Sequence, residues 1–112
     1  MSKIAKLLYE KSTNIGTNTS QEVLIGSEKK YKDFSDYTFL VVTINLNNNV
    51  GFFTELLFNS GSNFQKYMFT TGGSPDYYWA AYFAIRSDGI YIKPRSYYEA
   101  HYIIGIKIYG IK

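Results

Sequence analysis

Apolar and polar residues alternate along most of this chain, and short runs of turn residues separate the alternating segments. Side chains of a β-strand point to opposite faces in turn, so a period of two predicts half-buried strands. The regular succession of strand and turn is typical of an antiparallel sandwich or barrel. The expected strands are 4–10, 22–25, 37–46, 51–58, 64–71, 77–87, 90–95 and 102–111.

The segments between and within these strands carry more specific expectations. Residues 12–20 are rich in Ser, Thr, Asn and Gly and read as a link, and the polar stretch 26–36 reads as a loop with room for one helical turn. In the strand 37–46, residues at both odd and even positions are apolar, which predicts a central strand covered on both faces. Residues 59–63, Asn-Ser-Gly-Ser-Asn, read as a hairpin loop. The last strand is expected to place Ile104, Ile106 and Ile108 on one face and Lys107 and Tyr109 on the other.

The strongest local signal is the dipeptide Asp88-Gly89, which favours the type I′ turn of a two-residue hairpin. Such a turn would place Ser87 opposite Ile90 and Arg86 opposite Tyr91. One face of the hairpin then carries the apolar side chains of Trp79, Ala81, Phe83, Ile85, Ile90 and Ile92. The opposite face carries Tyr78, Tyr82, Arg86, Tyr91, Lys93 and Arg95.

This second face combines rings with cations, and an arginine over a tyrosine ring contributes about 0.5–1 kcal/mol at exposed sites. The pattern suits an ordinary outer sheet face, a subunit interface or a ligand surface. The ordinary outer sheet face is the first interpretation, and a subunit interface comes second, since Tyr and Arg are enriched where protein surfaces pair; a ligand surface comes last. The candidate interface residues are Tyr82, Arg86, Tyr91 and Lys93.

Aromatic residues make up 19% of the 112 residues, and several of them fall in expected loops at an edge of the sandwich. Rings in such loops can stack on sugar faces while neighbouring polar groups bond the hydroxyls, although packing of the loop onto the sheet edge is the more common role of such tyrosines. The candidate ligand-binding residues are Tyr77, Tyr78, Trp79, Tyr97, Tyr98, Arg95 and Asp76. The hairpin alternation also assigns Trp79 to the core.

Composition excludes several classes of site. The chain has no cysteine and one histidine, so disulfide frameworks, thiolate zinc sites and multi-histidine metal centres are excluded. Glu99 and His101 lie near Ser96, but we expect a hydrogen-bonded pair near a strand start rather than a hydrolytic triad. The net charge of +3 is spread along the chain, without the basic stripe of nucleic-acid-binding proteins. We therefore expect a non-enzymatic protein with no catalytic residue, metal, cofactor or nucleic-acid partner.

The two ends of the chain resemble a known family. The opening Lys6-Leu7-Leu8-Tyr9-Glu10, followed by Gly16 and Val23-Leu24-Ile25, is similar to the start of small β-sandwich tip domains of bacteriophage tail fibres and receptor-binding proteins. The strand Tyr37-Thr38-Phe39-Leu40-Val41-Val42 is similar to the family's "Y-x-x-L-x-V" strand, and residues 103–112 to its "I-x-x-I-x-G-I/Y-K" ending. The resemblance covers residues 1–46 and 103–112, and Lys11 stands where the family often has Gly.

The resemblance implies a component of the phage tail that recognises a host cell-surface glycan or wall polymer as a homotrimer, beside other virion proteins. It also implies synthesis in the host cytoplasm. The N-terminus has no apolar run typical of a signal peptide, and we expect no membrane insertion. Two alternatives remain, namely a structural virion protein (baseplate, decoration or fibre assembly) that binds another protein, and a monomeric carbohydrate-binding module. The expected fold is a single-domain, all-β antiparallel sandwich of jelly-roll-like type over residues 1–112, with about eight strands and little helix.

Overall fold

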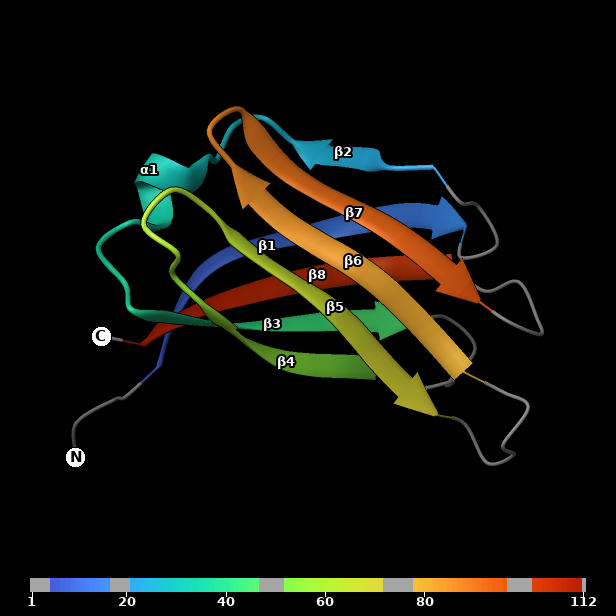
Figure 1. The fold of residues 1–112 in the computed structure, drawn as a ribbon. Helices are drawn as coiled ribbons and strands as arrows, with labels where there is room; N and C mark the ends of the chain where they lie inside the picture. Colours follow the sequence, from blue (N-terminus) through green and yellow to red (C-terminus); the bar gives the residue numbers. More distant parts are fainter. Residues whose placement is uncertain (1–4, 17–20, 47–51, 72–77, 97–101, 112) are drawn as a thin grey trace.

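The computed structural model describes residues 5–16, 21–46, 52–71, 78–96 and 102–111. Within these strands, the side chains of residues 52–53, 68–71, 78–79 and 95–96 lie outside the description. The described residues form an all-β domain of eight strands in two four-stranded antiparallel sheets, with one short helix (Figure 1). The all-β sandwich expected from the alternation is therefore confirmed. No helix in this part of the chain is long and apolar enough to cross a membrane.

The two sheets lie face to face (Figure 1). The first sheet has the order β1 (Lys6–Gly16), β8 (Tyr102–Ile111), β3 (Phe39–Leu46) and β4 (Phe52–Phe58). The second sheet has the order β2 (Val23–Gly26), β7 (Gly89–Ser96), β6 (Tyr78–Arg86) and β5 (Phe64–Thr71). The helix α1 (Tyr31–Phe34) lies between β2 and β3 in the chain and provides the single helical turn for which the sequence left room.

The two outer strand pairs are nested as in a jelly roll: the first strand pairs with the last, β1 with β8, and the second with the last but one, β2 with β7. The inner strands do not continue this nesting. The strands β3 and β4 form an ordinary hairpin, and β5, β6 and β7 form a meander. The first and last strands are therefore neighbours in the first sheet.

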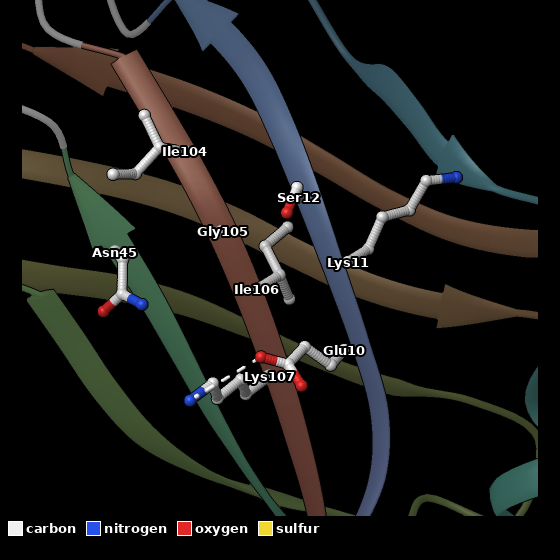
Figure 2. A pocket seen from close by; sticks show the side chains of 8 residues that line it. All are labelled: Glu10, Lys11, Ser12, Asn45, Ile104, Gly105, Ile106 and Lys107. Carbon is white, nitrogen blue, oxygen red and sulfur yellow. Dashed lines mark ion pairs between the residues drawn. The ribbon is translucent and has the colours of Figure 1, made fainter.

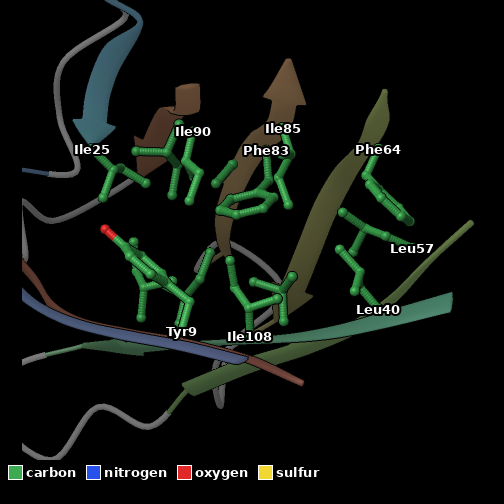
Figure 3. Close-up of a cluster of buried hydrophobic side chains, with 14 of the residues drawn as sticks. Tyr9, Ile25, Leu40, Leu57, Phe64, Phe83, Ile85, Ile90 and Ile108 are labelled. Atoms are coloured by element: carbon green, nitrogen blue, oxygen red, sulfur yellow. The ribbon is translucent and has the colours of Figure 1, made fainter. Parts of the chain in front are cut away.

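The core lies between the sheets and contains residues from both of them (Figure 3). Strand β3 alternates strictly, with Leu40, Val42 and Ile44 fully buried while Phe39 and Val41 are half-buried. The expectation that this strand is covered on both faces was therefore wrong. No described element lies over the outer face of the first sheet, so the apolar residues of odd number on β3 stay partly exposed.

Two loop predictions need correction. The strand β1 runs from Lys6 to Gly16 rather than from 4 to 10, because residues expected to form a link instead pair with β8, with Ile15 opposite Ile103. Residues 59–63 do form a tight turn, in which the Ser60 backbone N–H donates to the Asn63 carbonyl at 3.0 Å. Asn59 and Phe64 form a single antiparallel bridge across this turn, as in a hairpin, but β4 and β5 then belong to different sheets, so the connection as a whole is a crossover. A local turn pattern looks the same in both cases.

The hairpin between β6 and β7 also has a different register from the expected one. Ile85 pairs with Ile90 and Arg86 with Gly89, so the two loop residues are Ser87 and Asp88. Gly89, with φ of +157°, is needed beside β2, because a Cβ at this position would lie 2.7 Å from the Gly26 carbonyl oxygen. The register changes by an even number of residues, so the faces of the hairpin are as predicted: Ala81, Phe83, Ile85, Ile90 and Ile92 are fully buried.

The last strand contains a β-bulge that the alternation of apolar and polar residues did not predict. Ile106 and Ile108 are fully buried, as expected, but Ile104 is 45% exposed and Ile103 is buried in its place. Across β3, Asn45 pairs with Gly105 but Leu46 pairs with Ile103, so Ile104 is an extra residue of β8. Such a β-bulge turns the strand's side chains to the other face. The placement of Ile104 with Ile106 and Ile108 was therefore wrong.

Candidate functional site

The candidate ligand-binding residues gather at one end of the sandwich as far as the structure describes them. There β5 and β7 end and β6 begins, with Thr71 paired to Tyr78 and Trp79 paired to Ser96 (Figure 1). Arg95 pairs with Ala80 on the same two strands. The backbones of Tyr78, Trp79 and Arg95 are thus brought together on neighbouring strands. The other four candidates, Asp76, Tyr77, Tyr97 and Tyr98, lie outside the described residues.

The candidate interface residues share one surface, the outer face of the second sheet. Tyr82 and Arg86 on β6 and Tyr91 on β7 are half-buried there, and Lys93 on β7 is exposed. Tyr82 is paired directly with Lys93. The predicted placement of these four residues on one outer face is confirmed, whereas their role as an interface stays a prediction.

Arg86 organises this outer face. Its Nη1 and Nη2 donate to the two Glu22 carboxylate oxygens at 2.7 and 2.9 Å, and its guanidinium carbon lies 4.7 Å from the Tyr91 ring centre. The contact with Tyr91 was expected from the sequence. The ion pair with Glu22 was missed, because the two residues lie 64 positions apart and only the pairing of β2 with β7 brings them together.

Hydrogen bonds on this face shift the pKa values of Glu22, Arg86 and Tyr91. The bonds from Arg86 lower the pKa of Glu22 and raise that of Arg86 itself, which favours the ionised pair. The Tyr91 hydroxyl donates to Asp88 at 2.7 Å, and this bond raises the pKa of Tyr91. Tyr82 likewise donates to Gln65. The face therefore presents two tyrosine rings whose hydroxyls are held by hydrogen bonds, that of Tyr91 to Asp88 and that of Tyr82 to Gln65.

The outer face of the first sheet is different in character. Strand register places Leu7, Tyr109, Val41 and Leu56 in one row across all four strands, and Ile111, Phe39 and Phe58 in the next. We call these seven residues the apolar rows. Phe58 is 61% exposed and Leu7 is 46% exposed. The sequence did not lead to a prediction of this surface. The apolar residues at odd as well as even positions of 37–46 were the available indication of it.

The described glutamates are engaged with cations or a tyrosine rather than free in a cleft. At one open edge of the sandwich, Glu28 accepts a hydrogen bond from Tyr9 and lies 3.4 Å from the Lys11 Nζ. At the other open edge, Glu55 lies 3.3 Å from the Lys66 Nζ. The bond from Tyr9 lowers the pKa of Glu28 to about 2, the reverse of what a general acid needs.

A polar hollow of about 480 Å³ lies near α1, between Tyr31 and the turn at Asn59. The Asn59 side chain accepts from the Tyr31 hydroxyl at 2.7 Å and donates to the carbonyls of Ser35 and Tyr37. All of these partners belong to the chain itself. The asparagine therefore ties the crossover turn to the helix and leaves little of its bonding capacity for a ligand.

In the part of the chain that the structure describes, no three His, Cys, Asp or Glu side chains lie close enough together to hold a metal ion. The chain matches no family model, no curated protein and no solved structure.

Proposed function

We propose that this chain is a non-enzymatic component of a bacteriophage virion, a receptor-binding or tail-tip domain that attaches to a saccharide on the host cell surface. The observation that carries the proposal is the register at one end of the sandwich. It places the aromatic pair Tyr78-Trp79 on the strand next to Arg95. The resemblance of the chain's two ends to tail-fibre tip domains supports the same conclusion.

Binding would rely on stacking and hydrogen bonds. Tyr77, Tyr78, Trp79, Tyr97 and Tyr98 would supply rings for the apolar faces of sugars, and Arg95 and Asp76 would bond the hydroxyls. Residues at the ends of packed strands are positioned by a rigid scaffold, which limits the entropy lost on binding. A shallow site of this kind is weak alone, and a homotrimer in the virion tail would raise the avidity by presenting three of them.

The subunit contact of that homotrimer is proposed on the outer face of the second sheet. Tyr82, Arg86, Tyr91 and Lys93 supply the rings and the arginine that are enriched at interfaces. Arg86 and Tyr91 are already held by Glu22 and Asp88, so their ordering is largely complete before association. Preorganised side chains lose less rotamer entropy on binding.

The test uses the labelled full-length chain on a glycan array of bacterial surface polysaccharides. The variant Tyr97→Ala/Tyr98→Ala is expected to lose binding while its melting temperature stays unchanged. The matched control is Phe58→Ala, which removes an exposed aromatic ring of β4 on the other sheet, outside both the proposed sugar site and the proposed subunit contact. Undiminished binding by the double variant would reject the site, and failure of the unaltered chain on every polysaccharide would reject the function.

One observation favours a second candidate function. The apolar rows leave Phe58, Leu7 and Leu56 exposed on the outer face of the first sheet. Leu7 and Leu56 lie at opposite edges of the sheet and are joined by Tyr109 and Val41, so the rows are continuous across it. Continuous apolar rows of this kind are typical of protein contacts. A structural virion protein, in which this face packs against another protein, is therefore the alternative. It predicts stable association with protein and no binding to saccharide.

A further inference from the structure

Neither backbone conformation nor close packing requires the glycine in the middle of β8. Gly105 is not among the described glycines with positive φ, so its backbone conformation is open to any residue. A Cβ at this position would meet nothing closer than the Asn45 Nδ2 at 3.7 Å, which is an ordinary contact. Gly110 on the same strand differs, because a Cβ there would lie 2.4 Å from the Tyr37 ring. Packing therefore explains Gly110 but not Gly105.

Glycine inside a strand weakens it, and its presence often marks a bulge or the close approach of a ligand. Here the pairing of β8 is irregular with both of its neighbours, β1 and β3, at the same point. On the β3 side, Ile104 is extra, and on the β1 side the two residues between Ser12 and Ile15 face Ile104 alone. Bulges are frequent beside binding sites, where they redirect side chains. This pair turns Ile104 outward beside Gly105.

The result is a hollow of about 230 Å³ on the outer face of the first sheet, centred on Gly105 (Figure 2). Asn45 of β3 lies on one side of it and Ser12 of β1 on the other (Figure 2). Its lining residues are Glu10, Lys11, Ser12, Asn45, Ile104, Gly105, Ile106 and Lys107. A hollow of this size is below the range of about 300–1,000 Å³ for drug-sized ligands, and therefore suits one small ring.

The chemistry of the lining selects the class of ligand. Glu10 and Lys107 form an ion pair at 3.7 Å, and both side chains remain partly exposed beside the hollow. The pair adds no net charge, and the third charged lining residue, Lys11, directs its Nζ to the Ile25 carbonyl at 2.9 Å and to Glu28 at 3.4 Å. This balance disfavours an anion such as phosphate. It still offers a strong acceptor and a strong donor, to which Asn45 and Ser12 add an amide and a hydroxyl. The half-exposed Ile104 supplies an apolar contact.

We infer that the Gly105 hollow binds a neutral saccharide unit, with Glu10, Lys107, Asn45 and Ser12 bonding its hydroxyls and Ile104 contacting its C–H face. The missing side chain of Gly105 provides the space that the ring occupies. This inference rests on the proposed saccharide function and adds a second site to it, on the side of the sandwich rather than at its end.

The experiment is a titration of the ¹⁵N-labelled full chain with glucose, galactose and N-acetylglucosamine, followed by amide chemical shifts. With at least one sugar, the amides of Ser12, Asn45 and Gly105 are expected to shift and to saturate in the millimolar range. Inorganic phosphate, the charged probe, is expected to leave the chemical shifts of these amides unchanged. Absence of such shifts with all three sugars overturns the inference.

The variant Gly105→Val fills the hollow with a residue that favours strands, so the fold should be kept while the sugar-induced shifts are lost. Glu10→Gln keeps the shape and is expected to weaken binding by about tenfold, because a charged acceptor is replaced by a neutral one. Ser12→Ala should weaken binding, whereas Thr54→Ala, an exposed hydroxyl of the same sheet outside the hollow, should not. If Gly105→Val does not fold, Glu10→Gln and Ser12→Ala decide the question.

The outcomes separate this site from the proposed function. Sugar-induced shifts confined to residues 78–79 and 95–96 would overturn the Gly105 site and leave the proposed function standing. Unaltered sugar binding by Gly105→Val would do the same. Loss of every sugar-induced shift together with failure on the glycan array would overturn both.

Discussion

The Arg86 guanidinium lies 4.7 Å from the centre of the Tyr91 ring, one strand away on the outer face of the second sheet. Tyr91 is directly opposite Ala84, so Arg86 reaches it along the diagonal of the pair. The same guanidinium holds the Glu22 carboxylate through two bonds and thereby joins β6 to the residue that precedes β2. One side chain thus links three neighbouring strands, which gives the surface its fixed geometry.

The substitution Arg86→Lys is expected to lower the free energy of unfolding by about 0.5–1.5 kcal/mol, because lysine keeps the charge but loses the planar fork and the stacking. Urea unfolding measures this. A double-mutant cycle with Glu22→Gln should return a favourable coupling energy. A coupling of zero would mean that the ion pair contributes nothing to stability.

Two isoleucines of one strand provide a matched test of the bulge in β8. Ile106→Ala is expected to destabilise the domain by about 2–5 kcal/mol, because Ile106 is fully buried between the sheets. Ile104→Ala is expected to change stability by no more than about 0.5 kcal/mol, since Ile104 is 45% exposed. Chemical denaturation of both variants measures the difference. Equal destabilisation would contradict the assigned bulge.

These two residues also show how far sequence reasoning reaches. Alternation correctly assigned Phe83, Ile85, Ile90 and Ile92 to the core, since regular strands obey a period of two. It failed at Ile104, because a bulge arises from pairing with neighbours that are distant in the chain. The register of a strand and the sheet to which it belongs are likewise set by pairing with residues that are distant in the chain. The turn at 59–63 has the composition of a hairpin loop, yet it joins two different sheets.

The candidate site divides in a similar way. The outer-face placement of Tyr82, Arg86, Tyr91 and Lys93 followed from parity alone. The Gly105 hollow could not be found from sequence, because Glu10, Asn45 and Lys107 converge only when β1, β8 and β3 lie side by side. A glycine within an alternating strand was the one available signal.

Stability should fall in acid through Glu28. The hydrogen bond from Tyr9 lowers its pKa from 4.5 to about 2, so the folded state favours the ionised carboxylate. The stabilisation is complete above the unfolded-state pKa and is lost as the pH falls from about 4.5 towards 2. Unfolding measured over this range should show a shallower decline for Glu28→Gln than for the unaltered chain. Tyr9→Phe should also flatten the decline, and an unchanged slope in both variants would contradict the assignment.

The oligomeric state discriminates between the two outer faces. Light scattering after size exclusion is expected to give about three times the 12.9 kDa of one chain. Tyr82→Ser/Lys93→Glu should reduce this mass to that of a monomer, and Phe58→Ser should leave it unchanged. The opposite pattern would move the contact to the apolar rows and favour the structural role.

The central claim is recognition of a surface saccharide, and treated host cells test it most directly. Labelled full-length chain is applied to bacterial cells before and after periodate oxidation, which cleaves the vicinal diols of sugars, and in parallel after protease treatment. Periodate is expected to abolish binding, and protease is expected to leave it unchanged. Binding that survives periodate and disappears with protease would show a protein receptor and contradict saccharide recognition.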